Sequence, residues 1–144
     1  MSKGKRTLVI VPCAQQKAWD KNPKLGSVSA KEAYTSIPFR LNRQFAEKFG
    51  DQWLILSAKY GFIWPEFRIP GNYNVTFKKK DTSPISQSRL KDQVTKKKLY
   101  NCTKIFALGG KEYRQAIQEA FADYPITIIY PFAGLPIGKT VLST

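Results

Sequence analysis

Four short apolar runs recur along the chain and predict the strands of a buried sheet. They read TLVIV at residues 7–11, WLILS at 53–57, KIFAL at 104–108 and ITIIYPF at 126–132. Apolar runs of this length, without regular polar positions, are typical of strands that are covered on both faces. The pattern therefore predicts a central sheet whose strands are mostly parallel.

Apolar residues at helical spacing predict a helix after the first strand. Residues 14–36 are polar and interrupted by proline and glycine, so we expect a long surface loop with one helical turn near residues 30–34. In residues 39–49, Leu41, Phe45 and Phe49 lie four positions apart. We expect these three side chains to form the buried face of a helix that ends at the following glycine.

Two further helices are predicted in the second half of the chain. Residues 86–98 carry Leu90 and Val94 at helical spacing, and either Ser86 or Ser88 is placed to cap the helix. Residues 111–122 place Tyr113, Ile117 and either Ala120 or Phe121 on one helical face. Residues 62–80 contain too many prolines and glycines for regular structure, so we expect an ordered loop with a short extended piece at 73–77.

The alternation of strands and helices indicates the fold class. It favours an α/β domain of three layers, in which helices cover both faces of a sheet of about four strands. The length of 144 residues suits a single domain over residues 1–144, and the basic residues 1–6 are expected to be a flexible start. Ligands of such sheets bind at the carboxyl ends of the strands, which predicts a site within residues 12–17, 57–61, 109–113 and 131–138.

The charge balance adds an expected partner. The chain has 24 Lys and Arg against 10 Asp and Glu, a formal net charge of +14. Such an excess on a small domain attracts polyanions, and nucleic acid, either DNA or RNA, is the commonest of these. Two lysine runs flank the predicted third helix and form a basic flap over residues 78–98. The residues predicted to contact a nucleic-acid backbone are Lys78, Lys79, Lys80, Lys96, Lys97, Lys98 and Lys139.

The composition excludes several kinds of chemistry. The chain has no histidine and only two cysteines, Cys13 and Cys102, which do not form a CxxC pair. This excludes a Ser-His-Asp triad, a Cys-His dyad and every histidine-ligated metal site, so we expect neither a metal nor a cofactor. No apolar run is long enough to span a membrane and no signal peptide is evident, so we expect no membrane partner and a cytoplasmic location.

Residues 133–140, AGLPIGKT, match the loosest form of the phosphate-loop pattern. A working phosphate loop needs its Gly-Lys-Thr to open a helix, because the N–H groups of the first turn hold the phosphates. Only four residues follow Thr140, and Pro136 removes one N–H from the loop. We therefore interpret this stretch as a glycine turn that forms one wall of a pocket, with Lys139 as an anion contact.

Candidate chemistry follows the first and second predicted strands. Cys13 is either a nucleophile activated by nearby cations or a small residue filling a turn, and Lys17 is interpreted as a cation facing the ligand. Further along, Tyr60 either stacks on a base or covers the core. Glu66 is the only carboxylate of the loop that follows, which makes it the candidate general base, although a solvated surface glutamate fits the pattern equally well.

These segments together resemble a known family. In order, they are PCAQQK, AYTSIPFR, LSAKYGFIWPE with the later NYN, GGKEYRQAI and YPFAGLPIGK. The set is similar to small bacterial, archaeal and phage domains related to the YaaA peroxide-stress proteins. The Cys-x-x-x-Lys and Leu-Ser-x-x-Tyr-Gly patterns also resemble those of archaeosine synthases, in a wider group with folds like uracil-DNA glycosylase. The resemblance implies a glycosylase-like α/β fold and a link to nucleic acid or modified bases.

The resemblance also implies a set of pocket residues. Glu66, Lys17 and Cys13 are the catalytic candidates, and Pro65 is a further pocket position. Where relatives have an aspartate after the tyrosine of NYN, this chain has Asn74, whose amide cannot act as a carboxylate base. With Lys59, Asn74 and Gly110 added from the sequence itself, the expected substrate-binding residues are Tyr34, Ser57, Lys59, Tyr60, Gly61, Tyr73, Asn74, Gly109, Gly110 and Tyr113.

Three functions remain open from the sequence. The first is an enzyme that acts on a nucleobase or its glycosidic bond in DNA or RNA, with Glu66 polarising water or a leaving group. The second is a DNA- or RNA-binding module without catalysis, and the third is an enzyme of small-molecule nucleosides or nucleotides.

Overall fold

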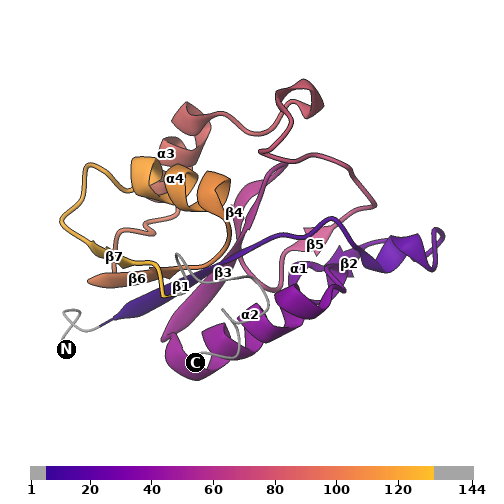
Figure 1. Ribbon diagram of the computed structural model, residues 1–144, viewed down its shortest axis with the longest axis horizontal. Helices are drawn as coiled ribbons and strands as arrows, with labels where there is room; N and C mark the ends of the chain where they lie inside the picture. The colour runs from indigo at the N-terminus through magenta and orange to yellow at the C-terminus, as the bar shows by residue number, and fades with distance from the viewer. Residues whose placement is uncertain (1–5, 132–144) are drawn as a thin grey trace.

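A five-stranded sheet forms the centre of the computed structural model, which describes residues 6–131 (Figure 1). Its strands are β1 (Thr7–Pro12), β3 (Gln52–Ser57), β4 (Gly61–Ile63), β6 (Lys104–Ala107) and β7 (Thr127–Ile129), in the order β4-β3-β1-β6-β7. Strands β3, β1, β6 and β7 are parallel, and only β4 runs antiparallel to its neighbour. The four predicted strands and the mostly parallel sheet are confirmed, with β4 as an unpredicted fifth strand.

Helices cover both faces of this sheet (Figure 1). On one face lie α1 (Ala30–Ala33) and α2 (Ile37–Phe49), and on the other lie α3 (Gln87–Lys96) and α4 (Lys111–Ala120). The long connections add two 3-10 turns, η1 (Ala18–Asp20) and η2 (Lys80–Thr82), and a small antiparallel sheet of β2 (Val28–Ser29) and β5 (Arg68–Ile69). In the described part of the chain, no helix is long and apolar enough to cross a membrane.

Both faces of β1 are buried, which explains why polar and apolar residues do not alternate in its sequence. Leu8 and Ile10 belong to the core under α3 and α4, whereas Val9 and Val11 belong to the core under α1 and α2. Because successive side chains of a strand point to opposite faces, a strand covered twice must be apolar at every position. Burial of each such side chain contributes about 1.5–3 kcal/mol before the entropy cost of ordering it.

Serine caps set the starts of two helices. The Ser36 hydroxyl accepts a hydrogen bond from the Phe39 N–H at 3.2 Å, and the Ser86 hydroxyl accepts one from the Arg89 N–H at 3.2 Å. Each bond satisfies one of the N–H groups that a first helical turn leaves without a partner. Ser86, rather than Ser88, is therefore the cap of α3.

The predicted buried face of α2 was partly wrong. Phe39 and Ala46 are its buried residues, whereas the Phe49 side chain is 47% exposed. Phe49 is the last residue of the helix, and its ring packs on the ring of Phe45 with centroids 4.8 Å apart. The spacing of apolar residues located the helix correctly, but the face it predicted to be buried is rotated from the face that is buried in the structure.

The interpretation of residues 62–80 as a loop was also partly wrong. Phe62 and Ile63 are buried in β4, and Arg68–Ile69 form β5, while residues 73–77 form no strand. Strand β4 has three residues and is followed directly by Trp64 and Pro65, so its sequence contains no run long enough to indicate a strand.

Candidate functional site

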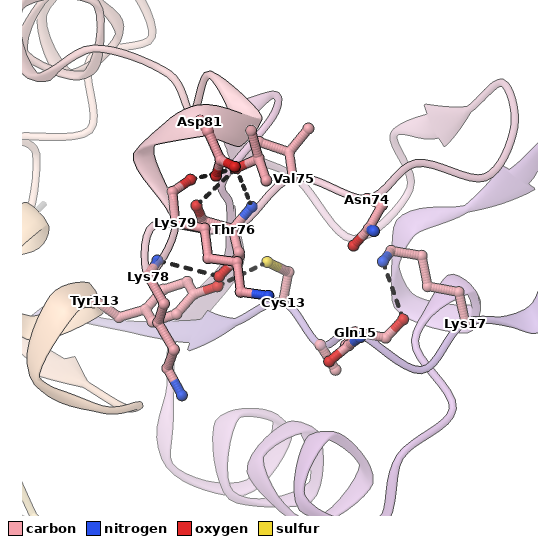
Figure 2. A pocket seen from close by; sticks show the side chains of 12 residues that line it. Cys13, Gln15, Lys17, Asn74, Val75, Thr76, Lys78, Lys79, Asp81 and Tyr113 are labelled. Carbon is pink, nitrogen blue, oxygen red and sulfur yellow. Dashed lines mark hydrogen bonds between the residues drawn. The ribbon is translucent and has the colours of Figure 1, made fainter.

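A cavity of about 440 Å³ opens beyond the carboxyl end of β1 (Figure 2). Three segments line it: the residues that follow β1, the connection that carries residues 74–82, and the first turn of α4. This is the edge of a parallel sheet at which ligands are expected. The lining residues are Cys13, Ala14, Gln15, Lys17, Asn74, Val75, Thr76, Lys78, Lys79, Asp81, Thr82 and Tyr113.

Cys13 and Tyr113 meet on one wall of the cavity. The Cys13 Sγ lies 3.2 Å from the Tyr113 hydroxyl oxygen. Burial raises the pKa of the Tyr113 phenol, and a thiolate at Cys13 would raise it further, so the phenol stays neutral at physiological pH. The pair therefore places the Cys13 sulfur beside a protonated phenol, and either group can donate the hydrogen bond.

Gly109 makes this meeting possible. Its φ is +114°, and a Cβ built on it would lie 3.0 Å from the Pro12 side chain and 3.2 Å from the Tyr113 Cβ. Only glycine combines this backbone angle with so close an approach. Helix α4 can thus begin directly over the end of β1, which brings Tyr113 to Cys13.

Lys17 is a buried cation beside the cavity. Its exposed fraction is 4%, its Nζ donates to the Gln15 carbonyl at 3.1 Å, and the same Nζ lies 4.4 Å from the centroid of the Tyr73 ring. Within residues 6–131, no carboxylate lies within ion-pair distance of Lys17 Nζ. Burial lowers the pKa of Lys17, because desolvation disfavours the charged amine. The site consequently holds a cation whose charge an anionic ligand would compensate.

Three buried hydroxyl groups fix the ring beneath this lysine. The Tyr73 hydroxyl is hydrogen-bonded to the Ser57 hydroxyl at 2.9 Å and also to the Tyr34 hydroxyl. Ser57 ends β3 and its hydroxyl also accepts the N–H groups of Lys59 and Tyr60. Burial raises the pKa values of Tyr34 and Tyr73, so both phenols stay protonated. The network joins three distant segments and orients Tyr73 toward Lys17.

The turn between β3 and β4 packs against Tyr73 but does not line the cavity. Tyr60 packs against the rings of Phe67 and Tyr73 with centroids 5.4 and 5.5 Å apart, and Lys59 Nζ lies 5.3 Å from the Tyr60 ring centroid. None of Lys59, Tyr60 and Gly61 lines the cavity. The structure therefore places Lys59 and Tyr60 around Tyr73, not on the cavity wall.

A residue that the sequence analysis missed holds this turn. Gln93 of α3 accepts the Phe62 N–H at 2.8 Å and donates to the Tyr60 carbonyl at 2.9 Å. Gly61 has a φ of +79°, and a Cβ there would lie 2.2 Å from the Gln93 amide oxygen. Gln93 carries no sequence signal for this role, because its partners are backbone groups more than thirty positions away.

The structure does not bring Glu66 to the cavity. Its side chain is 75% exposed and its carboxylate lies 3.6 Å from the Lys31 Nζ, while the neighbouring Pro65 is buried. Among the described residues, the carboxylate that lines the cavity is that of Asp81. It follows the run Lys78–Lys80 in the sequence, where the charge pattern indicated only backbone contacts. Thr82 folds this connection by donating to the carbonyl of Thr76 at 3.0 Å.

The predicted backbone-contacting lysines divide into separate groups. Lys78 and Lys79 line the cavity, and Lys80 is exposed at the start of η2. Lys96 is paired with Asp92 at 2.9 Å, and the Nζ of Lys97 donates to the carbonyl of Phe62. Lys98 lies in a separate groove with Lys97. Lys139 and the glycine turn of residues 133–140 lie outside the described residues.

The remaining predicted positions lie around the same site. Asn74 lines the cavity, and its side chain and the Lys17 amine point toward one another in Figure 2. Gly110 is the N-cap residue of α4 and, as a glycine, provides no side-chain hydrogen bond to the first turn. Residues 6–131 contain no group of three or more His, Cys, Asp or Glu side chains that could hold a metal ion.

Comparison with known proteins identifies relatives but no activity. The chain matches the model of a family of unknown function (DUF6884) over residues 8–142. It is 34% identical over 119 residues to "Uncharacterized protein YfjM" of Bacillus subtilis (strain 168), covering 83% of this chain and 79% of that protein. No solved structure is a significant match. Because the family model spans nearly all of the sequence, the chain belongs to the DUF6884 family.

Proposed function

We propose that the protein binds single-stranded or locally unpaired nucleic acid and that the cavity takes up one unpaired base. The observation that carries this proposal is Lys17, a buried cation beside the cavity whose Nζ has no carboxylate within ion-pair distance among the described residues. Lys78 and Lys79 add two cations to the lining, and the whole chain has a formal net charge of +14. This distribution favours an anionic polymer whose backbone follows the lysines.

The size and lining of the cavity suit a base. Its volume of about 440 Å³ lies within the usual range of small-ligand sites. The amides of Gln15 and Asn74 each supply both donors and an acceptor, which is what the hydrogen-bonding edge of a base requires. The neutral phenol of Tyr113 adds a further donor when the Cys13 thiol donates to it. We infer that the base enters the cavity while its phosphates remain with Lys78 and Lys79.

Fluorescence anisotropy with labelled single-stranded DNA and RNA tests this function. The double variant Lys78→Ala/Lys79→Ala should bind more weakly, and the slope of log affinity against log salt should fall in magnitude by about 1.4, or ~0.7 for each lost phosphate contact. The matched control is Lys24→Ala/Lys48→Ala, which removes the same charge from two exposed residues that line no described cavity. Equal slopes for the two variants would refute a role of the cavity lysines.

A second candidate is an enzyme that acts on the bound base or its glycosidic bond. The observation that favours it is the convergence of a thiol, a buried amine and a carboxylate on one cavity, from Cys13, Lys17 and Asp81. The resemblance to YaaA-related proteins and archaeosine synthases, with their glycosylase-like folds, supports this direction. In a hydrolytic reaction Asp81 would orient the attacking water, since Asn74 cannot accept its proton. Mass spectrometry of oligonucleotides containing modified bases tests it: the parent should change a substrate that Asp81→Asn leaves intact.

A small-molecule nucleotide enzyme makes a different prediction. If the cavity serves free nucleotides, a mononucleotide should compete with the oligonucleotide at concentrations near its own dissociation constant for the protein. If the polymer is the ligand, competition by a mononucleotide should be weak, because it lacks the phosphates that contact the neighbouring lysines.

A further inference from the structure

A groove of about 180 Å³ lies at the amino ends of the parallel strands, opposite the carboxyl ends where the cavity lies. It is formed where β1 and β3 begin, by Trp64 after the antiparallel strand β4, and by the turn that follows α3. The cavity lies beyond the carboxyl end of β1, so the groove and the cavity are separated by about the length of that strand, on the order of 20 Å. The groove is a separate surface, not an extension of the cavity.

Trp64 is a partly exposed aromatic residue that lines this groove. Its exposed fraction is 36%, and within residues 6–131 its indole N–H has no hydrogen-bond partner and its ring stacks on no other ring. Large aromatic side chains usually bury their ring and pair their polar atom. An exposed indole with a free donor is therefore placed to contact a ligand.

Cations surround this indole. Arg6, Lys97 and Lys98 line the groove, and no lining residue in the described part of the chain is a carboxylate. Lys97 is held by the Phe62 carbonyl, whereas the side-chain nitrogens of Arg6 and Lys98 have neither a hydrogen bond nor an ion pair within residues 6–131. Two free cations beside an aromatic face are the elements with which proteins hold single-stranded nucleic acid.

Lys98 has a left-handed backbone conformation, which is unfavourable for a residue with a side chain. Its φ is +54°, and the turn closes with bonds from the Lys98 N–H to the Thr95 carbonyl and from the Leu99 N–H to the Val94 carbonyl. Helices that end in this way usually place glycine at this residue, because a Cβ disfavours the left-handed conformation. The chain instead places a lysine there, beside Trp64.

We propose that this groove is a second contact site for single-stranded nucleic acid, in which a base stacks on Trp64 and its phosphates contact Lys98 and Arg6. The proposal rests on the proposed function and extends it, because the same strand would reach both edges of the sheet. Stacking on an indole is independent of base identity, and a guanidinium beside the ring strengthens it. The groove would then supply affinity without sequence preference, while the cavity selects an unpaired base.

Tryptophan fluorescence and binding of a single-stranded oligonucleotide test this site. Trp64→Ala should lower affinity roughly 5-fold or more, as expected for the loss of one stacked base, whereas Trp64→Phe, which keeps a stacking ring, should stay within about 3-fold of the parent. The oligonucleotide should quench emission of the parent. Trp64→Phe should lose most of that quenching, since Trp19 is buried in the core and Trp53 is partly buried against it.

The outcomes separate this inference from the function on which it rests. Unchanged affinity in Trp64→Ala, together with full quenching in Trp64→Phe, overturns the groove site even if the cavity variant Lys78→Ala/Lys79→Ala binds weakly. Weak binding by the Trp64→Ala and Lys98→Ala variants, with parent-like binding by the cavity variant, supports the groove and refutes the cavity. A parent protein that binds no single strand refutes both.

Discussion

Among single residues, the buried polar groups beyond the end of β1 determine the chemical character of the cavity. Lys17 keeps a charge that burial penalises, and the chain maintains it with one carbonyl acceptor, the face of Tyr73 and the attraction of Asp20, which lies beyond ion-pair distance. Such a cation is costly for folding, because desolvation of an amine is only partly compensated by these partners. A residue of this kind is better explained by a ligand than by stability.

The first prediction concerns the pH dependence of this cost. The pKa of Lys17 is lowered from its usual 10.5, so between its folded pKa and 10.5 the unfolded chain binds more protons than the folded protein. The free energy of unfolding should therefore rise with pH in that window, as the buried amine loses its charge. Lys17→Met should be more stable than the parent at neutral pH, and this advantage should shrink by about pH 10.

Urea unfolding of both proteins at the two pH values measures this difference. Both proteins contain the other titrating groups, including Tyr34, Tyr73 and Tyr113, so the contributions of those groups to the pH dependence cancel in the difference between the two free energies of unfolding. An advantage that stays constant across the window would show that Lys17 is not buried as a charged amine.

The second prediction concerns the hydroxyl network. Tyr73→Phe leaves the buried Tyr34 hydroxyl without its partner, which should lower the free energy of unfolding by about 1–3 kcal/mol. The matched control is Tyr124→Phe, which removes a hydroxyl bonded to Thr95 at an exposed site and should cost less than about 0.5 kcal/mol. Similar losses in denaturant titrations of the two variants would refute the network.

At the scale of elements, turns determine how the site is assembled. Gly61 and Gly109 both take left-handed backbone angles, and each allows a second element to approach the end of a strand. Gln93 then joins α3 to the turn of β3 and β4, and α4 begins over Pro12. The cavity is thus a consequence of where the chain turns, and single turn residues control it.

The third prediction compares two glycines. Gly61→Ala should lower the free energy of unfolding by more than about 1 kcal/mol, because the new Cβ adopts a left-handed φ and meets the Gln93 amide. A Cβ at Gly71 meets nothing within 4 Å, so Gly71→Ala should be neutral or stabilise by about 0.4–1 kcal/mol through the unfolded chain. Thermal and urea unfolding of both variants check the contrast, and the prediction fails if the two substitutions cost the same.

The fourth prediction concerns the end of α3. Lys98→Gly should raise the free energy of unfolding by about 1 kcal/mol, since glycine adopts the φ of +54° without a steric cost. If the groove binds nucleic acid, the same variant should bind a single strand more weakly. A variant that is more stable but binds equally well would show that the lysine has no role in the groove.

The elements also show what the sequence could and could not predict. The buried strands and helices α2, α3 and α4 were evident because runs and spacing are local, and the strand order placed Cys13, Lys17 and Tyr113 at one edge. Strand β4 was missed because three residues carry no periodicity. The position of Asp81 in the cavity lining was not predicted, because the path of the connection after β5 depends on distant contacts, among them the bond between Ile85 N–H and the Ala58 carbonyl.

At the scale of the whole molecule, two cation-lined surfaces lie at opposite edges of one sheet. The cavity has Lys17, Lys78 and Lys79, and the groove has Arg6 and Lys98 beside Trp64. When one nucleic-acid strand contacts both surfaces at once, its affinity is far higher than that of either contact alone, provided that the strand is long enough to span both. A short oligonucleotide should therefore bind weakly, and affinity should rise steeply once its length allows contact with both edges.

The most direct measurement is the alkylation rate of Cys13 with and without a saturating single-stranded oligonucleotide. Cys13 lines the cavity, and Cys102→Ser removes the second thiol, so the rate in that variant reports Cys13 alone. A base in the cavity should slow the reaction severalfold, and salt that releases the strand should restore it. An unchanged Cys13 rate while the oligonucleotide is fully bound would contradict the claim that the cavity holds a base.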